Sequence, residues 1–197
     1  MQGAPLVAAA VGDTVYLIGG WDSTPRSPGD KEGDFHAEID VLDLEAERAS
    51  VSDYRLPDPL RRAFTGVVHD GRIILLGGIT EGRSHFDWVD RASAFDPGSG
   101  AWSDLAPLPF PTIAPGAGVY DGKVLLFGGM TPNGLYRNTI YALDLSSPKA
   151  WGNTGRYLAE EKGFPIVSSH PDGGLLIMGG HSYGYEDGAR TTAPSPP

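Results

Sequence analysis

One short unit recurs four times along the chain, and it consists of an apolar run followed by a pair of glycines. The copies read GDTVYLIGGW (12–21), DGRIILLGGI (70–79), DGKVLLFGGM (121–130) and DGGLLIMGGH (172–181). Successive first glycines are 58, 51 and 51 residues apart. A period of this size is the signature of a repeat architecture. The repeat therefore limits the possible folds before composition is considered.

Each complete unit divides into four short strands with no helical period between them, which excludes parallel βαβ units. Asp70-Gly71 is the two-residue turn expected between the first two strands. In the second unit we expect strands over 63–69, 72–78, 88–97 and 101–109. Repeated four-stranded antiparallel sheets predict an all-β propeller whose blades pack face to face around an axis. We expect the second strand to lie near that axis, with glycines at its exit that allow close approach and positive φ.

The same landmarks resemble the kelch repeat, the galactose oxidase/kelch type of propeller. The stretch GGITEGRSHFDWVDRASAFDPGSGAWSDLAPLP (77–109) carries the Gly-Gly pair, a Phe-Asp-Pro step and a Trp about six residues further on. The third unit has Leu143 in place of the aromatic residue; the first has Leu42 there and no Trp near 49–50. The resemblance covers roughly 5–181. The motif residues are Gly19, Gly20, Asp43, Gly77, Gly78, Asp96, Trp102, Gly128, Gly129, Asp144, Trp151, Gly179 and Gly180.

The repeat count predicts a partial ring of about three and a half blades over 1–181. Units at about 5–56, 63–109 and 114–151 have four strands, whereas 164–180 has two. Residues 182–197 read as a loop and Pro-rich tail, disordered or a linker. Three outcomes are open: a fragment of a longer protein, two copies pairing through exposed blade faces, or an open arc. We favour the fragment.

Composition restricts the partners and the compartment. A formal net charge of −10 argues against nucleic acid and membrane surfaces, which attract clustered cations. No apolar run approaches the roughly 18 residues of a spanning helix, and the first residues read poorly as a secretory signal. The chain has no cysteine, which leaves the compartment open. We favour the cytoplasm.

Comparison among the units separates scaffold residues from candidate site residues. Asp43, Asp96 and Asp144 recur and are expected to cap the turn between strands three and four. Non-repeated arginines, histidines and aromatics instead fall on the loops after the second strands and on the loops between blades, where binding residues are commonly found. We predict a non-catalytic module that binds a protein or peptide through Trp21, His36, Arg62, Arg83, His85, Tyr136, Arg137, His181 and Tyr183.

The enzymatic alternative is a sialic acid epimerase or mutarotase, an isomerase acting on a small sugar acid, because such enzymes also use a kelch ring. The resemblance would give the binding of the substrate carboxylate to Arg62 or Arg137 and the acid–base role to Glu81 or Glu186. Copper oxidases with a kelch propeller need a cysteine, which this chain lacks. His36, His85 and His181 come from different units without chelating spacing. We therefore predict no metal and no cofactor, and leave catalytic residues unassigned.

Overall fold

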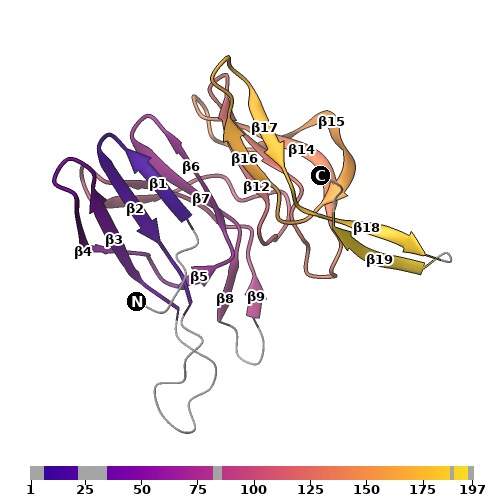
Figure 1. Ribbon diagram of the computed structural model, residues 1–197, viewed down its shortest axis with the longest axis horizontal. Coiled ribbons are helices and arrows are strands. Elements are labelled where there is room, and N and C mark those ends of the chain that lie inside the picture. Colours follow the sequence, from indigo (N-terminus) through magenta and orange to yellow (C-terminus); the bar gives the residue numbers. More distant parts are fainter. Residues whose placement is uncertain (1–6, 22–34, 82–85, 187–188, 195–197) are drawn as a thin grey trace, which may run out of the picture.

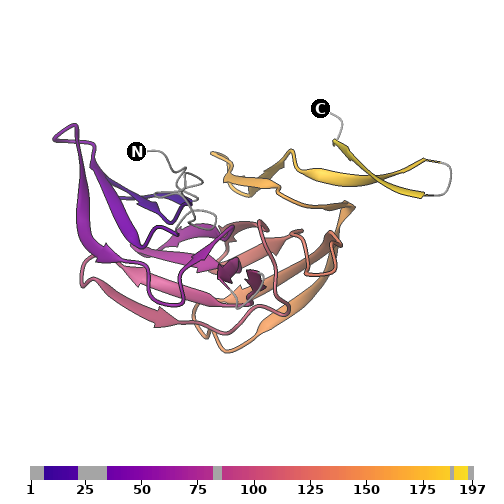
Figure 2. The same cartoon turned by 90° about the horizontal axis from the view of Figure 1, so that it is seen from below.

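The computed structural model describes residues 7–21, 35–81, 86–186 and 189–194, and the described chain is all-β. It contains three four-stranded antiparallel sheets, or blades, and a fourth unit of two strands. Figures 1 and 2 show these sheets following one another along an open arc. The predicted fold class, a partial kelch-type propeller, is confirmed. Nothing in the described ranges forms a helix with the length and apolar character needed to span a bilayer.

Each blade is a run of adjacent antiparallel strands. Blade 1 consists of β1 (Val7–Val11), β2 (Thr14–Ile18), β3 (Glu38–Asp43) and β4 (Arg48–Arg55). Blade 2 consists of β6 (Thr65–His69), β7 (Arg72–Leu76), β10 (Ala92–Asp96) and β11 (Ala101–Asp104). Blade 3 consists of β12 (Gly116–Tyr120), β13 (Lys123–Phe127), β14 (Arg137–Asp144) and β15 (Trp151–Lys162). Blade 4 contains β16 (Ile166–Ser169) and β17 (Leu175–Met178).

The first strand of each blade, and not the second, lies innermost. Neighbouring blades meet through β1 and β6, β6 and β12, and β12 and β16. Small residues make this approach possible, because a Cβ on Gly66 would lie 2.6 Å from Val7 and one on Gly116 would lie 2.7 Å from Val167. The second strand, expected near the axis, lies directly beside this innermost strand. Neither Gly66 nor Gly116 therefore leaves room for a larger side chain beside the neighbouring blade.

The residues that enter each blade are joined by backbone hydrogen bonds along the arc. Ala114 N–H donates to Ala63 O (2.8 Å), and Phe164 N–H donates to Ala114 O (3.2 Å). Each of the three residues stands two positions before its first strand and has a positive φ, of 57°, 43° and 58° in chain order. Two alanines and a phenylalanine thus adopt the same unusual conformation. The backbone geometry is therefore repeated more faithfully than the sequence.

The glycine pairs form the corners at which one blade meets the segment entering the next. Gly77 has a φ of 70°, and a Cβ there would lie 2.5 Å from Thr112 O. Gly78 N–H donates to that same carbonyl at 2.8 Å, and Gly129 N–H donates to Lys162 O at 2.9 Å. A side chain at position 77 would combine a left-handed backbone with a clash against fixed backbone.

Aromatic residues close the junctions between complete blades. Trp102 of blade 2 donates from Nε1 to Arg55 O of blade 1, and Trp151 of blade 3 donates to Ala106 O beyond blade 2, both at 3.0 Å. Phe95 is fully buried in the first core cluster and stacks on Trp102 with ring centroids 4.9 Å apart. Leu143, with Tyr141 and Trp151 beside it, packs in the second cluster. Strands three and four of a blade thus cover the preceding blade.

The recurring aspartates hold the turn between those two strands. Asp43 Oδ1 accepts from Ala46 N–H (2.8 Å), and Asp96 Oδ1 accepts from Gly98 N–H (2.9 Å). Asp144 Oδ1 accepts from Ser146 N–H (2.9 Å) and from its hydroxyl (2.6 Å). Hydrogen bonds from Ser99 and Gly98 lower the pKa of Asp96, and those from Ser146 lower the pKa of Asp144, because they stabilise the carboxylate.

Two segments that the sequence analysis treated as loops contain hairpins. In blade 2, β8 (Ile79–Glu81) pairs with β5 (Arg61–Arg62) and β9 (Phe86–Trp88). After blade 4, β18 (His181–Glu186) pairs with β19 (Ala189–Pro194) and projects from the arc (Figures 1 and 2). The expectation of a tail without regular structure over 182–197 therefore differs from the described backbone. The hairpin is joined to the arc at its base, where His181 and Gly163 exchange two backbone hydrogen bonds of 2.7 and 2.8 Å.

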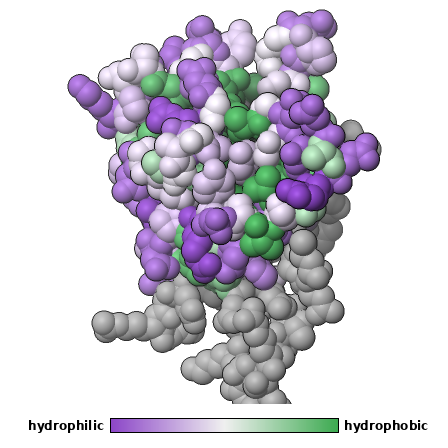
Figure 3. All heavy atoms as spheres, turned by 90° about the vertical axis from the view of Figure 1, so that its left-hand side faces the viewer, coloured by the Kyte–Doolittle hydropathy of each residue, from purple (hydrophilic) through white to green (hydrophobic). Residues whose placement is uncertain are grey.

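The two ends of the arc expose apolar residues to different extents. Viewed from the side of blade 1, apolar spots are interrupted by polar residues (Figure 3). On blade 4, Ile166, Leu176 and Met178 are 65%, 44% and 45% exposed. The register places Ile166 opposite Met178, so these side chains share the face of β16–β17 that points away from blade 3.

Candidate partner-binding face

The loop face is the end of the arc at which Gly20, Gly78, Gly129 and Gly180 lie. It collects the segments that follow the second strands and the segments that connect the blades. The predicted contact residues fall into two separate groups there. Two positions, Arg83 and His85, lie outside the described residues, and so does the side chain of Tyr183 on β18.

The first group, the Arg62 cluster, consists of Trp21, Phe35, His36 and Arg62 at the junction of blades 1 and 2. Trp21 and Phe35 form an isolated antiparallel bridge that closes the loop after β2. The Arg62 guanidinium carbon lies 4.4 Å from the Trp21 ring centroid and 5.5 Å from that of Phe35. Stacking on two rings fixes the plane of the cation. The sequence predicted three of these residues but missed Phe35.

His36 belongs to this cluster through its backbone and its position beside Phe35. Its N–H donates to Gly20 O at 3.2 Å, which ties the end of the loop to the glycine corner. Its Nε2 is buried and has no hydrogen-bond partner among the described residues. A buried ring nitrogen without a partner is costly.

The second group, the His181 cluster, consists of Tyr136, Arg137, Phe164 and His181 near the junction of blades 3 and 4. Tyr136 is only 9% exposed, and a Cβ on Gly163 would lie 2.5 Å from its ring. His181 is exposed and meets Phe164 edge to face, with centroids 5.8 Å apart. The exposed members of the cluster are thus Arg137, His181 and Phe164, whereas Tyr136 supports the backbone beneath them.

Arg137 repeats the device of the first cluster with a different aromatic residue. Its guanidinium carbon lies 4.5 Å from the centroid of the Phe110 ring, which itself packs edge-on against Tyr141 at 5.5 Å. Phe110 and Phe164 are not among the contact residues predicted from the sequence. Both stand in Phe-Pro steps of the segments that connect the blades, and this shared position was the available signal.

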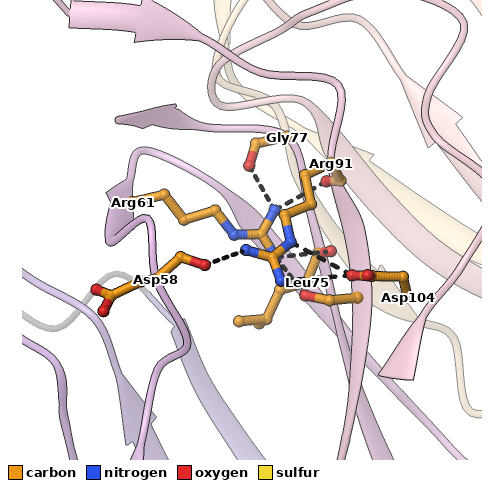
Figure 4. Close-up of polar contacts among 7 residues, drawn as sticks. Asp58, Arg61, Leu75, Gly77, Arg91 and Asp104 are labelled. Carbon is orange, nitrogen blue, oxygen red and sulfur yellow. Dashed lines mark hydrogen bonds and ion pairs between the residues drawn. The ribbon is translucent and has the colours of Figure 1, made fainter. Parts of the chain in front are cut away.

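Arg61 precedes Arg62 in the chain but has a different role (Figure 4). It is only 1% exposed. Its guanidinium donates to Gly77 O (2.9 Å), Arg91 O (2.8 Å), Leu75 O (3.4 Å) and the Ser93 hydroxyl. Burial, with the nearby charge of Arg91, lowers the pKa of Arg61 to about 9. This arginine crosslinks the exit of β7 to β10 and belongs to the scaffold.

The loop face offers no assembled metal or acid–base centre among the described side chains. No group of three or more metal-ligating residues is present in that part of the chain. His36 and His181 stand in separate clusters. The carboxylates of the epimerase alternative, on Glu81 and Glu186, lie outside the described side chains. What the described residues offer is two arginines held on aromatic rings and one exposed histidine.

The radially stacked blades, the glycine corners and the loop face define a kelch-type β-propeller segment. The solved structure titled "Structure of YjhT" superposes with a TM-score of 0.72 at 15% identity, covering 92% of this chain and 59% of that one. No family model matches the chain.

Related sequences point to the same family. Kelch-like protein 40 of Xenopus tropicalis is 30% identical over 171 residues, 85% of this chain, and that of Xenopus laevis is 30% identical over 178 residues. Kelch-like protein 35 of Mus musculus is 31% identical over 91 residues, 46% of this chain. The chain spans 25% of the length of the Xenopus relatives. It belongs to the kelch-repeat family.

Proposed function

We propose that this kelch-repeat segment is a non-catalytic binding module that holds a protein or peptide partner on its loop face. The observation that carries the proposal is the stacking of Arg62 and Arg137 on aromatic rings. A stacked guanidinium loses less conformational entropy on binding than a free one. Arginine with aromatic neighbours is also the composition of binding hot spots.

The chemistry of the clusters favours a partner segment that presents carboxylates or backbone carbonyls. Arginine forks pair with such oxygens in a fixed geometry. Because the chain carries a net charge of −10, these rim cations stand out locally against an acidic background. No observation favours the sugar-acid isomerase, whose catalytic carboxylates would lie outside the described side chains.

The test is selection of peptides from a displayed random library against the whole chain, followed by affinity measurement on variants. Replacing both Arg62 and Arg137 with alanine is expected to weaken the selected peptides by at least about 30-fold, since a hot-spot residue contributes about 2 kcal/mol or more. Arg72→Ala is the matched control, because Arg72 is exposed at the start of β7, at the opposite end of the blade.

Two results would contradict the proposal. One is that selected peptides bind the double variant and the unmodified chain equally. The other is accelerated interconversion of sialic acid anomers in NMR spectra, which would show catalysis. An Arg62→Lys variant separates charge from stacking, because lysine keeps the cation but loses the planar contact with Trp21.

A further inference from the structure

A groove of about 620 Å³ lies between blade 3 and blade 4, on a different part of the molecule from the arginine clusters. Its floor comes from blade 3 and includes Leu125, Ile140 and Ala142, and its wall includes Leu175 and Ile177 of β17. Lys123, Arg156 and Asp121 also line it. The groove is thus apolar along the strands and carries more cations than anions.

The equivalent space is filled at the junction of blades 2 and 3. There Leu143, Tyr141 and Trp151, from strands three and four of blade 3, pack with Ala92 and Ala94 of blade 2. Ala94 is therefore only 2% exposed, whereas Ala142, its counterpart in blade 3, is half-buried. The groove is the place over blade 3 where a third strand of blade 4 would lie.

The edge of β17 that would receive this strand is unoccupied in the described chain. β17 pairs with β16 alone, in a two-stranded sheet. In complete blades, the residue four positions before the first glycine of the pair faces a large apolar residue of strand three. Ile73 faces Phe95 and Val124 faces Leu143. The corresponding residue of blade 4 is Leu175, which lines the groove.

The internal repeats also specify the sequence of an incoming strand. In the complete blades, the third-strand residue that faces the counterpart of Leu175 is Leu42, Phe95 or Leu143. In every case an aspartate follows it. The return strand of blades 2 and 3 adds Trp102 or Trp151. Strand addition supplies main-chain hydrogen bonds for affinity and side-chain pockets for specificity. An acidic segment also complements Lys123 and Arg156.

We propose that this groove binds an extended segment of a partner polypeptide, which adds to β17 as the third strand of blade 4. Its recognition sequence is a large apolar residue followed by aspartate. A second folded copy of the chain is a poorer occupant, because β3, β10 and β14 each already pair with a strand on both sides. Two copies would also bring net charges of −10 together.

The experiment uses the whole chain and a fluorescent peptide copying residues 90–105, DRASAFDPGSGAWSDL. Fluorescence anisotropy is expected to show saturable binding. A peptide carrying Phe95→Ser and Trp102→Ser is expected to bind at least about tenfold more weakly, because two large side chains no longer fill the groove. Ala142→Trp in the protein fills the floor and is expected to weaken the original peptide by a similar factor.

Leu176→Ser is the matched control, because Leu176 lies on the same strand but on the face opposite to Leu175. It is expected to leave peptide affinity unchanged. A second measurement needs no variant: hydrogen exchange of the unmodified chain with bound peptide should slow at the amides of β17 and leave the loop face unchanged.

Several results would overturn the proposal. One is the absence of saturable peptide binding, and another is equal affinity for the original and the serine-substituted peptide. A third is slowed hydrogen exchange at amides outside β17. The last is a loss of peptide affinity with Leu176→Ser as large as that with Ala142→Trp. A dimer in light scattering that Ala142→Trp dissociates would assign the groove to a second copy instead. None of these outcomes depends on Arg62 or Arg137, so the two binding proposals can fail separately.

Discussion

The junction of blades 2 and 3 and the junction of blades 3 and 4 are built from the same backbone corner but differ in what covers them. At the closed junction, strands three and four of the following blade bury the preceding sheet, and Leu76 and Leu143 are both fully buried. At the open junction those strands are absent from the described chain, and a groove remains. The difference shows that the glycine corner positions a blade, whereas strands three and four seal it.

Substitutions at the glycine corners are expected to lower the free energy of unfolding more than any other change considered. Gly77 and Gly179 are equivalent, with φ values of 70° and 61°. A Cβ on Gly77 would meet Thr112 O at 2.5 Å, whereas one on Gly179 would meet no atom within 4 Å. Gly179→Ala is expected to cost about 1–2 kcal/mol from the left-handed backbone alone. Gly77→Ala adds a clash with fixed backbone and is expected to cost about 3–5 kcal/mol.

Urea unfolding of both variants measures this difference as a change in the free energy of unfolding. Gly12→Ala supplies a control, because Gly12 has a φ of 59° and no neighbour within 4 Å of a built Cβ. Equal losses for Gly77→Ala and Gly179→Ala would show that the two corners are packed alike, and the comparison would fail.

The aspartate-capped turns of the complete blades are expected to make a smaller contribution to stability, and this contribution depends on pH. Hydrogen bonds lower the pKa of Asp96 below its ordinary value of 3.8. A carboxyl whose folded pKa is lowered adds stability above the unfolded pKa, and that stability disappears as the pH falls through the folded pKa. We therefore expect the cap of blade 2 to weaken below about pH 4.

Urea midpoints at pH 7 and pH 3 test this expectation for the unmodified chain and for Asp96→Asn. The asparagine keeps an oxygen acceptor but does not titrate, so the drop between the two pH values should be smaller in the variant. An unchanged drop would show that Asp96 contributes no pH-dependent stability. Asp172, an exposed residue in the turn of blade 4, serves as the control position.

Much of the fold could be predicted from the sequence, because strand order depends on local signals that repeat. The Asp-Gly turn at 70–71 and the apolar run before Gly77 recur closely enough to place the strands. The position of the innermost strand could not be predicted in this way. It depends on how close Gly66 and Gly116 come to the neighbouring blade, and an isolated glycine gives no sign of its tertiary neighbours. The hairpin after Gly180 likewise contacts Gly163, which is distant in the sequence.

The candidate site was predictable by residue type but not by arrangement. Arg61 and Arg62 are adjacent residues of the same type, and the sequence does not distinguish them. In the structure Arg61 is buried among carbonyls, whereas Arg62 stacks on Trp21. Alternation along β5 sends neighbouring side chains to opposite faces, and only the fold decides which face is buried. Phe35, which completes the Arg62 cluster, comes from the far end of a variable loop, so its spacing from Trp21 carries no repeating signal.

Hydrogen exchange of the unmodified chain without any peptide tests the central claim most directly. If complete blades are sealed by strands three and four while β17 keeps a free edge, amides of β7 and β13 should exchange at least about tenfold more slowly than the edge amides of β17. Equal and slow exchange in all three strands would contradict the account, since it would mean that the fourth junction is already closed.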